Sequence, residues 1–219
     1  MPGSIWKRIL LGFSTHQMVN SNGETPSLSQ SLKLTSDREL FENISLAKKT
    51  FVKLFSRVGN EFSNESLNLA HKYHKGIKIS QGNELQHCPY QVLDIIRDFD
   101  ISHGLNIRIL HWWGRGIYLL IFMGNHHPSL KSLAPLLGLI KTREYGLCKN
   151  DLWAYKEIID GKGFETADSL NKENLAEHLK SEIPFQLIKS LPTGEADLLE
   201  RLIINEVDDF LTWIGSRHF

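Results

Sequence analysis

The sequence has no surplus of charge of either sign. Among its 219 residues, 25 Lys and Arg balance 25 Asp and Glu, so the formal net charge is zero. A protein that coats DNA usually carries a basic surplus, because it neutralises many phosphates at once. The balance argues against a dedicated DNA-coating protein, although it leaves room for a local basic patch.

Cysteine is scarce as well. The two cysteines, Cys88 and Cys148, lie far apart in the chain and fit no zinc spacing such as C-x2-C. This count excludes a disulfide framework and favours a reducing compartment. The sequence also has no Gly-rich phosphate-binding motif and no G-x-S-x-G motif, so it predicts no cofactor.

Long apolar runs are missing. The longest, residues 117–123, is far shorter than the ~20 residues that a membrane-spanning helix needs. Near the N-terminus, residues 9–11 are too short for a secretory signal, and no small-residue cleavage site follows them. We therefore expect a cytoplasmic protein without a membrane span.

The first 35 residues differ from the rest by being mostly polar. Residues 14–35 are rich in Ser, Thr, Asn and Gln and offer little apolar surface to bury, which predicts a mobile segment over residues 1–35. A polar composition also suits the export signal of an injected bacterial effector, which would reach a host cytosol by a non-classical route. Composition alone does not separate these two interpretations.

Residues 36–219 have the pattern of one globular domain built mainly from helices. Ser36 and Glu39 match a capping box, and apolar residues then recur at helical spacing. Pro89 is well placed to open a third helix. The last helix has a continuous apolar stripe in which we expect Leu202 and Phe210 to be buried, with a penalty of roughly 2–5 kcal/mol for truncating either to Ala.

The strongest strand signal lies in the middle of the chain. Residues 106–113 and 117–123 are rich in β-branched and aromatic side chains and flank the short link 114–116, which predicts a β-hairpin. The second arm is apolar throughout and should be buried on both faces. Because a lone hairpin is only marginally stable, we expect an α+β fold in which a small antiparallel sheet of residues 106–123 is covered by about six helices.

Charge is segregated along the chain in spite of the zero net charge. Residues 44–80 contain seven Lys or Arg and two Glu, whereas residues 181–209 contain seven acidic and two basic residues. Three interpretations are open: solvated helix faces, two regions that pair with each other, and a basic face for nucleic acid or an acidic partner.

Histidine is the one unusually frequent residue, at ten, and it supplies candidate catalytic groups. If Pro89 opens a helix, the preceding Cys88 lies where a helix dipole lowers a thiol pKa, next to His87. On the predicted hairpin, His111 and Arg115 could serve acid–base chemistry and anion binding. The candidate catalytic residues are therefore His87, Cys88, His111 and Arg115.

Candidate binding residues lie on and just after the hairpin. Arg108, Trp112 and Trp113 form a basic, aromatic surface of the kind that stacks on and grips RNA. His126 and His127 follow the second strand, at a strand end where loops often carry function.

No metal site is predicted. His71 and His74 share one face of a predicted helix at i, i+3 spacing, but no third ligand stands nearby in the sequence. The H-E-x-x-H pattern is also absent.

Two functions are compatible with these features. The first is a bacterial interaction protein of the effector type, which binds a protein partner and carries an export-like N-terminus; the lack of a catalytic signature favours it slightly. The alternative is a small enzyme, either an RNA-directed nuclease or toxin that uses the aromatic hairpin, or a cysteine-dependent transferase or hydrolase. The partner, the substrate and the oligomeric state are open.

Overall fold

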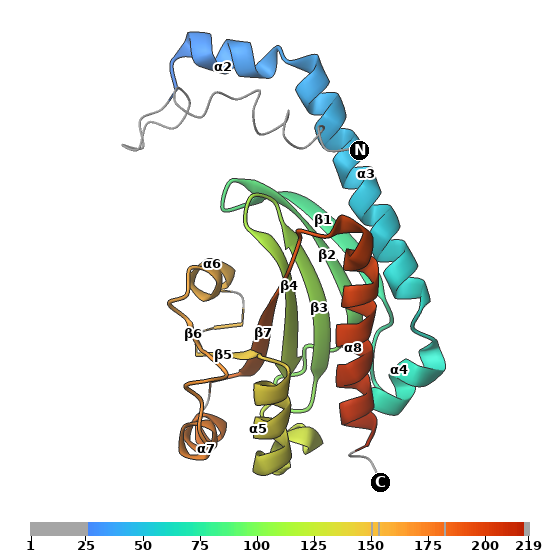
Figure 1. The fold of residues 1–219 in the computed structure, drawn as a ribbon, viewed down its shortest axis with the longest axis vertical. Helices are drawn as coiled ribbons and strands as arrows, with labels where there is room; N and C mark the ends of the chain where they lie inside the picture. The colour runs from blue at the N-terminus through green and yellow to red at the C-terminus, as the bar shows by residue number, and fades with distance from the viewer. Residues whose placement is uncertain (1–25, 150, 153, 182, 217–219) are drawn as a thin grey trace. The chain divides into compact units, whose positions relative to one another are not determined.

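A computed structural model gives the fold of the chain and describes residues 26–149, 151–152, 154–181 and 183–216. The chain divides into two compact units, residues 1–50 and residues 51–219. Figure 1 labels the helices and strands along the chain.

The second unit is built on a sheet of seven antiparallel strands in the order β1-β2-β3-β4-β7-β5-β6. The strands are β1 (Lys78–Leu85), β2 (Cys88–Arg97), β3 (Leu105–Trp112), β4 (Gly116–Met123), β5 (Gly146–Cys148), β6 (Phe164–Glu165) and β7 (Phe185–Leu191). The α+β class is confirmed, but the predicted small hairpin is wrong in size, because it is the centre of a much larger sheet.

The predicted hairpin itself is confirmed. β3 and β4 pair in register from Leu105 opposite Met123 to Trp112 opposite Gly116. Gly114 and Gly116 have φ values of 73° and 127°, which L-residues with a side chain rarely adopt. The glycines therefore allow the tight link, and the register places alternate side chains on opposite faces of the sheet.

The predicted third helix is wrong, because its residues form strand β2. Pro89 lies near the start of β2, where a strand tolerates proline. β1 and β2 are joined by Gln86 and His87, both with positive φ (50° and 66°), as the two central residues of a tight hairpin turn require. Gln-His lacks the Asn-Gly signature of such turns, so this hairpin was not predictable from its turn residues.

Both faces of the central strands are buried among apolar side chains. On one face, Ile107 and Ile109 of β3 join a core that includes Phe210 of α8 (Leu199–Gly215). On the other face, Leu110 and neighbouring side chains pack with residues of α6 (Tyr155–Ile159). Figure 1 shows α8 beside one face of the sheet and α6 beyond the other. This arrangement explains why the β4 sequence is apolar throughout.

Five further helical segments complete the second unit, besides the C-terminal part of α3 (Arg38–Asn60). They are α4 (Asn64–Ala70), η1 (Pro128–Lys131), α5 (Leu133–Thr142), α7 (Lys172–Lys180) and η2 (Ala196–Leu198). Helices were expected to dominate, but the seven-stranded sheet makes the fold mixed.

In the first unit, the described residues form α2 (Leu28–Thr35) and the N-terminal part of α3. α2 lies inside the segment predicted to be mobile, and residues 1–25 of that segment lie outside the described part of the chain. The predicted capping box at Ser36 is wrong: Ser36 ends α2, and the carboxylate of Asp37 accepts a hydrogen bond from the backbone N–H of Leu40 (2.9 Å).

The basic and acidic stretches of the sequence meet at one described ion pair. The guanidinium of Arg57 in α3 donates to the carboxylate of Glu200 in α8 at 2.6 Å, and this partner lowers the pKa of Glu200. Both side chains are partly exposed, so the pair contributes little to stability.

The two expected core residues of α8 differ in burial, which predicts different effects of truncation. Phe210 is fully buried, whereas Leu202 only packs against the edge of the core. We expect Phe210→Ala to lower the free energy of unfolding by roughly 3–5 kcal/mol. Leu202→Ala should lower it by about 1 kcal/mol. Urea denaturation of both variants measures the difference, and equal losses would contradict this packing of α8.

Candidate active site: a histidine cluster at one end of the sheet

Two loops meet at the end of the sheet where β2 and β4 finish and β3 begins. The loop after β4, residues 124–127, donates backbone hydrogen bonds to the loop between β2 and β3, residues 98–104. The bonds are Gly124 N to Gly104 O (2.8 Å), Asn125 N to Ile101 O (2.8 Å) and His126 N to Ser102 O (2.7 Å). The two loops are thereby fixed against each other as a short ladder.

Glycine is required on both sides of this ladder because the backbones approach so closely. A Cβ at Gly104 would lie 2.5 Å from the carbonyl oxygen of Asp100. A Cβ at Gly124 would lie 2.5 Å from the carbonyl carbon of Ser102. Since real Cβ atoms do not approach backbone so closely, a side chain at Gly104 would distort the loop between β2 and β3, and one at Gly124 would separate the two loops.

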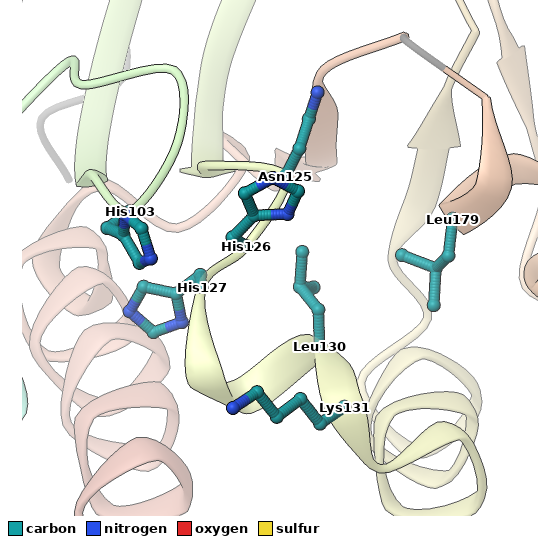
Figure 2. Close-up of a pocket in the computed structure, with 7 residues that line it drawn as sticks. All are labelled: His103, Asn125, His126, His127, Leu130, Lys131 and Leu179. Carbon is teal, nitrogen blue, oxygen red and sulfur yellow. The ribbon is translucent and has the colours of Figure 1, made fainter.

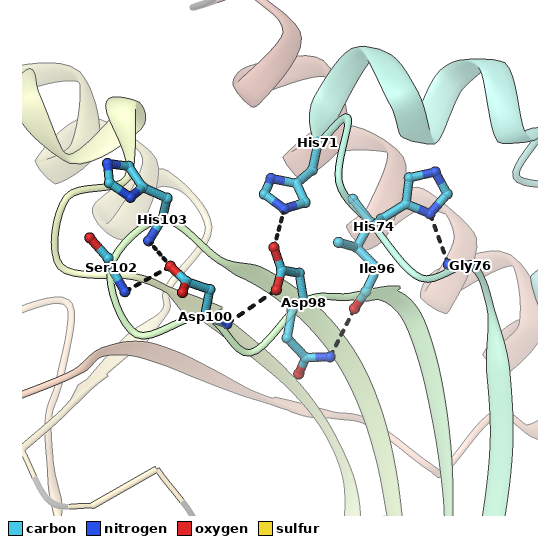
Figure 3. A network of polar contacts seen from close by, with 9 residues as sticks. His71, His74, Gly76, Ile96, Asp98, Asp100, Ser102 and His103 are labelled. Atoms are coloured by element: carbon cyan, nitrogen blue, oxygen red, sulfur yellow. Dashed lines mark hydrogen bonds and ion pairs between the residues drawn. The ribbon is translucent and has the colours of Figure 1, made fainter.

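Two carboxylates shape the loop between β2 and β3. Oδ1 of Asp100 accepts hydrogen bonds from the backbone N–H groups of Ser102 (3.0 Å) and His103 (2.6 Å). Oδ1 of Asp98 accepts from the N–H of Asp100 (3.1 Å). The other oxygen of Asp98 lies 2.8 Å from Nε2 of His71, which follows α4 (Figure 3). Asp98 therefore links the loop to His71 and holds the proton of that ring on Nε2.

His127 is the most buried histidine of the cluster, with 2% of its surface exposed. Its Nδ1 accepts a hydrogen bond from the backbone N–H of Ser129 at 3.3 Å. Because that N–H can only donate, Nδ1 carries a lone pair and Nε2 of the neutral ring carries the proton. The ring of His127 lies 6.1 Å from the ring of His71, centroid to centroid.

An open pocket of about 440 Å³ lies against this cluster (Figure 2). Its lining residues are His103, Asn125, His126, His127, Leu130, Lys131 and Leu179. The rings of His103 and His126 are exposed neighbours with centroids 5.9 Å apart. The pocket thus combines three imidazoles, one ammonium group and an apolar wall.

His74 lies next to the cluster but has a structural role. Its Nδ1 accepts a hydrogen bond from the backbone N–H of Gly76 (3.1 Å), and Figure 3 shows its ring turned away from Asp98. Burial, and to a lesser extent the charge of His71, lowers its pKa. Among the described residues, no three His, Cys, Asp or Glu side chains are grouped so as to hold a metal ion.

The sequence pointed to only part of this site. His126 and His127 were candidates because they follow a strand, and the structure brings them together with His71, Asp98 and His103. For His71, the sequence indicates only its i, i+3 spacing to His74. His103 had a usable signal, because it lies one residue before a glycine in a strand-to-strand loop.

Most of the other candidate residues lie near the opposite end of the sheet. His87 is exposed in the β1–β2 turn, and Cys88 opens strand β2. The helix N-terminus that would activate the Cys88 thiol is therefore absent there, and this part of the cysteine hypothesis is wrong. The second cysteine, Cys148, is buried, and burial raises the pKa of its thiol to about 12.

His111 is half-buried and packed against other aromatic side chains. Its ring lies 3.7 Å from the ring of Phe51, centroid to centroid. The side-chain oxygen of Gln91 lies 3.0 Å from Nδ1 of His111 and also accepts a hydrogen bond from the indole N–H of Trp113 (2.8 Å). Burial lowers the pKa of His111 to about 4, so the ring is neutral at pH 7.

The remaining catalytic candidate, Arg115, and the binding candidates on the hairpin are engaged within the protein. Arg108 donates to both carboxylate oxygens of Asp94 (2.7 and 3.2 Å) and to the hydroxyl of Tyr155 (2.7 Å). Arg115 pairs with Asp160, and its guanidinium lies 5.3 Å from the ring centroid of Trp112. Trp112 is fully buried. A phosphate would have to compete with the two carboxylates for these arginines.

Comparison with known protein families, with curated proteins and with solved structures finds no match for this chain. No helix in the described ranges is both long enough and apolar enough for a bilayer crossing. Function must therefore be inferred from the geometry of the site.

The burial of His111 predicts that stability falls in acid. Because its pKa is about 4 in the folded chain and about 6.5 in the unfolded chain, only the unfolded state gains a proton between these values. Stability contributed by His111 is present above pH 6.5 and is lost as the pH falls toward 4. His111→Gln should reduce the drop in unfolding free energy between pH 7 and pH 4.5 by roughly 2 kcal/mol.

The matched control is His87→Asn, because Asn tolerates the left-handed conformation that His87 adopts in an exposed turn. This variant should keep the pH dependence of the unaltered protein in urea denaturation. An unchanged drop in His111→Gln would mean that His111 is accessible to protons in the folded state.

Proposed function

We propose that the histidine cluster is the active site of an enzyme that cleaves RNA by acid–base catalysis. The observation that carries this proposal is the convergence of His103, His126 and His127 on one pocket that also contains Lys131. The proposal develops the nuclease alternative from the sequence but moves its site from the aromatic hairpin to the opposite end of the sheet.

His103 and His126 are the groups assigned to proton transfer. Both rings are exposed at the pocket and are close enough for one bound phosphate to reach both. Histidine is the side chain best suited to give and take protons near neutral pH. Lys131 would stabilise negative charge on the phosphate oxygens, and the apolar Leu130 and Leu179 would contact a base or the sugar.

RNA is favoured because it brings its own nucleophile. None of the seven lining residues is Ser, Thr or Cys, whereas the 2′-hydroxyl of RNA lies beside the phosphorus that it attacks. One imidazole takes the 2′-hydroxyl proton as the 2′-oxygen–phosphorus bond forms. The other gives a proton to the departing 5′-oxygen as its bond to phosphorus breaks. The products are a 2′,3′-cyclic phosphate and a 5′-hydroxyl.

His71, Asp98 and His127 support the two proton-transfer groups without transferring protons themselves. His127 borders the pocket and offers the N–H at Nε2, while Asp98 fixes the orientation of the neighbouring His71. We assign His71 and Asp98 as positioning residues, since neither is among the pocket-lining side chains.

The interaction-protein hypothesis is retained as a second proposal. It is supported by exposed apolar side chains on α2 and on the first part of α3. An RNA-cleaving protein would act in the cytoplasm, or in a host cytosol if the polar N-terminus serves as an export signal. Most of that polar segment lies outside the described residues.

The catalytic assignment predicts that His103→Ala and His126→Ala each lower kcat for RNA cleavage by about 100-fold or more, because each removes one proton-transfer group. Both side chains are exposed, so the melting temperature should change little. The measurement is cleavage of a short fluorescent RNA, with the 2′,3′-cyclic phosphate identified by mass spectrometry. The same sequence as DNA should remain intact.

His87→Asn is the matched control, because it removes an exposed histidine near the other end of the sheet and Asn tolerates the positive φ of that position. This variant should cleave RNA normally. The proposal fails if the unaltered protein leaves all RNA substrates intact. It also fails if His103→Ala and His126→Ala retain full activity.

A separate prediction concerns Asp98. Asp98→Asn keeps an acceptor for the N–H of Asp100 but turns an amide toward His71, which reverses the proton position on that ring. We expect kcat to fall roughly tenfold, equivalent to about 1.4 kcal/mol, with KM unchanged and the pH–rate profile displaced. An altered KM with an unchanged pH profile would indicate a structural role only.

A further inference from the structure

The loop between α4 and β1, residues 71–77, combines positive charge with an exposed aromatic ring. Between residues 66 and 83 the chain has three lysines, Lys72, Lys75 and Lys78, and no acidic residue. All three are exposed, and none of their ammonium groups forms an ion pair with a carboxylate of the described chain. This segment of the basic stretch is therefore available to an external anion.

Tyr73 lies in the turn at the start of this loop, with 74% of its surface exposed. Residues 71–74 form the turn, which is closed by a hydrogen bond from the N–H of His74 to the carbonyl oxygen of His71 (3.2 Å). Lys72 directly precedes Tyr73, and Lys75 follows two residues later. Proteins bind single-stranded nucleic acid with this combination, because the aromatic ring stacks on a base and the cations contact the phosphates.

The loop is held against the end of strand β2, so Tyr73 is positioned before a ligand binds. The N–H of Lys75 donates to the carbonyl oxygen of Arg97 (3.1 Å), and the guanidinium of Arg97 donates to the carbonyl oxygen of Lys75 (2.8 Å). The contact of His71 with Asp98 holds the other end of the loop (Figure 3). A preformed surface of this kind loses little conformational entropy on binding.

His71 connects Tyr73 to the pocket of the histidine cluster. The ring of His71 lies 6.4 Å from the ring of Tyr73 and 6.1 Å from the ring of His127, centroid to centroid. His127 is one of the residues that line the pocket. A base stacked on Tyr73 would therefore belong to the nucleotide next to the one that the pocket holds.

We propose that Tyr73, Lys72 and Lys75 form a subsite for a second nucleotide of the RNA substrate, beside the pocket that holds the first. The base stacks on Tyr73, and the two ammonium groups contact the phosphate attached to that nucleotide. Because every base has an aromatic face, the subsite accepts all four bases. The proposal rests on the RNA-cleaving function for the identity of the ligand, but its contacts are separate from the groups that transfer protons.

The first test is a binding measurement, which does not require activity. The probe is a fluorescein-labelled RNA pentanucleotide with 2′-O-methyl groups, which the proposed reaction cannot cleave, and binding is followed by fluorescence anisotropy. Tyr73→Ala should weaken binding about tenfold, whereas Tyr73→Phe should not, because phenylalanine keeps the stacking face. The matched control is Phe41→Ala, which removes an exposed aromatic side chain (49%) of α3 and should bind the probe normally.

The lysines are tested in the same assay. Lys72→Gln and Lys75→Gln should each weaken binding roughly threefold, because each variant loses one ionic contact with a phosphate. Lys162→Gln is the matched control, since it removes an exposed lysine between α6 and β6 and should bind the probe normally. Far-UV circular dichroism confirms that each variant is folded.

The second test uses the cleavage reaction. Tyr73→Ala should raise KM for an RNA pentanucleotide about tenfold and leave kcat unchanged, because stacking contributes equally to the bound substrate and to the transition state. The KM for a nucleoside 3′-methyl phosphate should not change, since this compound has the scissile bond but no second nucleotide.

Three results would overturn the subsite. The first is a probe that does not bind the unaltered protein. The second is a Tyr73→Ala variant that binds and cleaves RNA like the unaltered protein; if His103→Ala and His126→Ala are then inactive, the proposed active site stands without the subsite. The third is competition by poly-glutamate as strong as competition by RNA of equal length, which would assign the surface to an acidic protein. Binding that depends on Tyr73 without any cleavage would support the RNA surface and overturn the proposed active site.

Discussion

The structure depends on the double-sided burial of strands β3 and β4. Apart from Asn106, Arg108 and His111, their side chains are apolar on both faces, and nearly all of them are removed from water. Removing apolar surface from water stabilises the fold by about 25 cal/mol for each Å². Both faces of these strands contribute only if other elements cover both of them. The α8 side and the α6 side of the sheet supply these two covers. β2 pairs with β3 and β7 pairs with β4, so the positions of these neighbouring strands depend on the register of the β3–β4 hairpin.

The position of the histidine cluster follows from this antiparallel arrangement. β2 ends, β3 begins and β4 ends at the same end of the sheet, so the loops that follow β2 and β4 must lie side by side. The close ladder between them needs Gly104 and Gly124, and the carboxylates of Asp98 and Asp100 fix the first loop. The imidazoles are therefore carried by loops, but by loops that the rigid sheet and their own hydrogen bonds hold in place.

Local sequence signals predicted the central hairpin of the sheet. The other strands and half of the site could not be predicted, because they depend on pairing between distant residues. β3 and β4 were predictable because their β-branched and aromatic residues surround a glycine-containing link. β2 was not, because Pro89 before an apolar run is equally compatible with a helix start, and the Gln86–His87 turn has no glycine. The site was half predictable for the same reason: His126 and His127 follow a strand, whereas the link between His71 and Asp98 joins residues 27 positions apart.

The zero net charge constrains how the proposed substrate is held. Because the net charge is zero, the protein as a whole exerts little long-range attraction on a polyanion, so substrate binding must come mainly from contacts within the pocket. The arginines of the hairpin do not add to it, since Arg108 and Arg115 face carboxylates. Lys131 is the one Lys or Arg among the residues that line the pocket, so a bound RNA would have few of its phosphates neutralised there. Affinity should therefore depend only weakly on salt, which is the behaviour of a site that recognises one or two nucleotides rather than an extended strand.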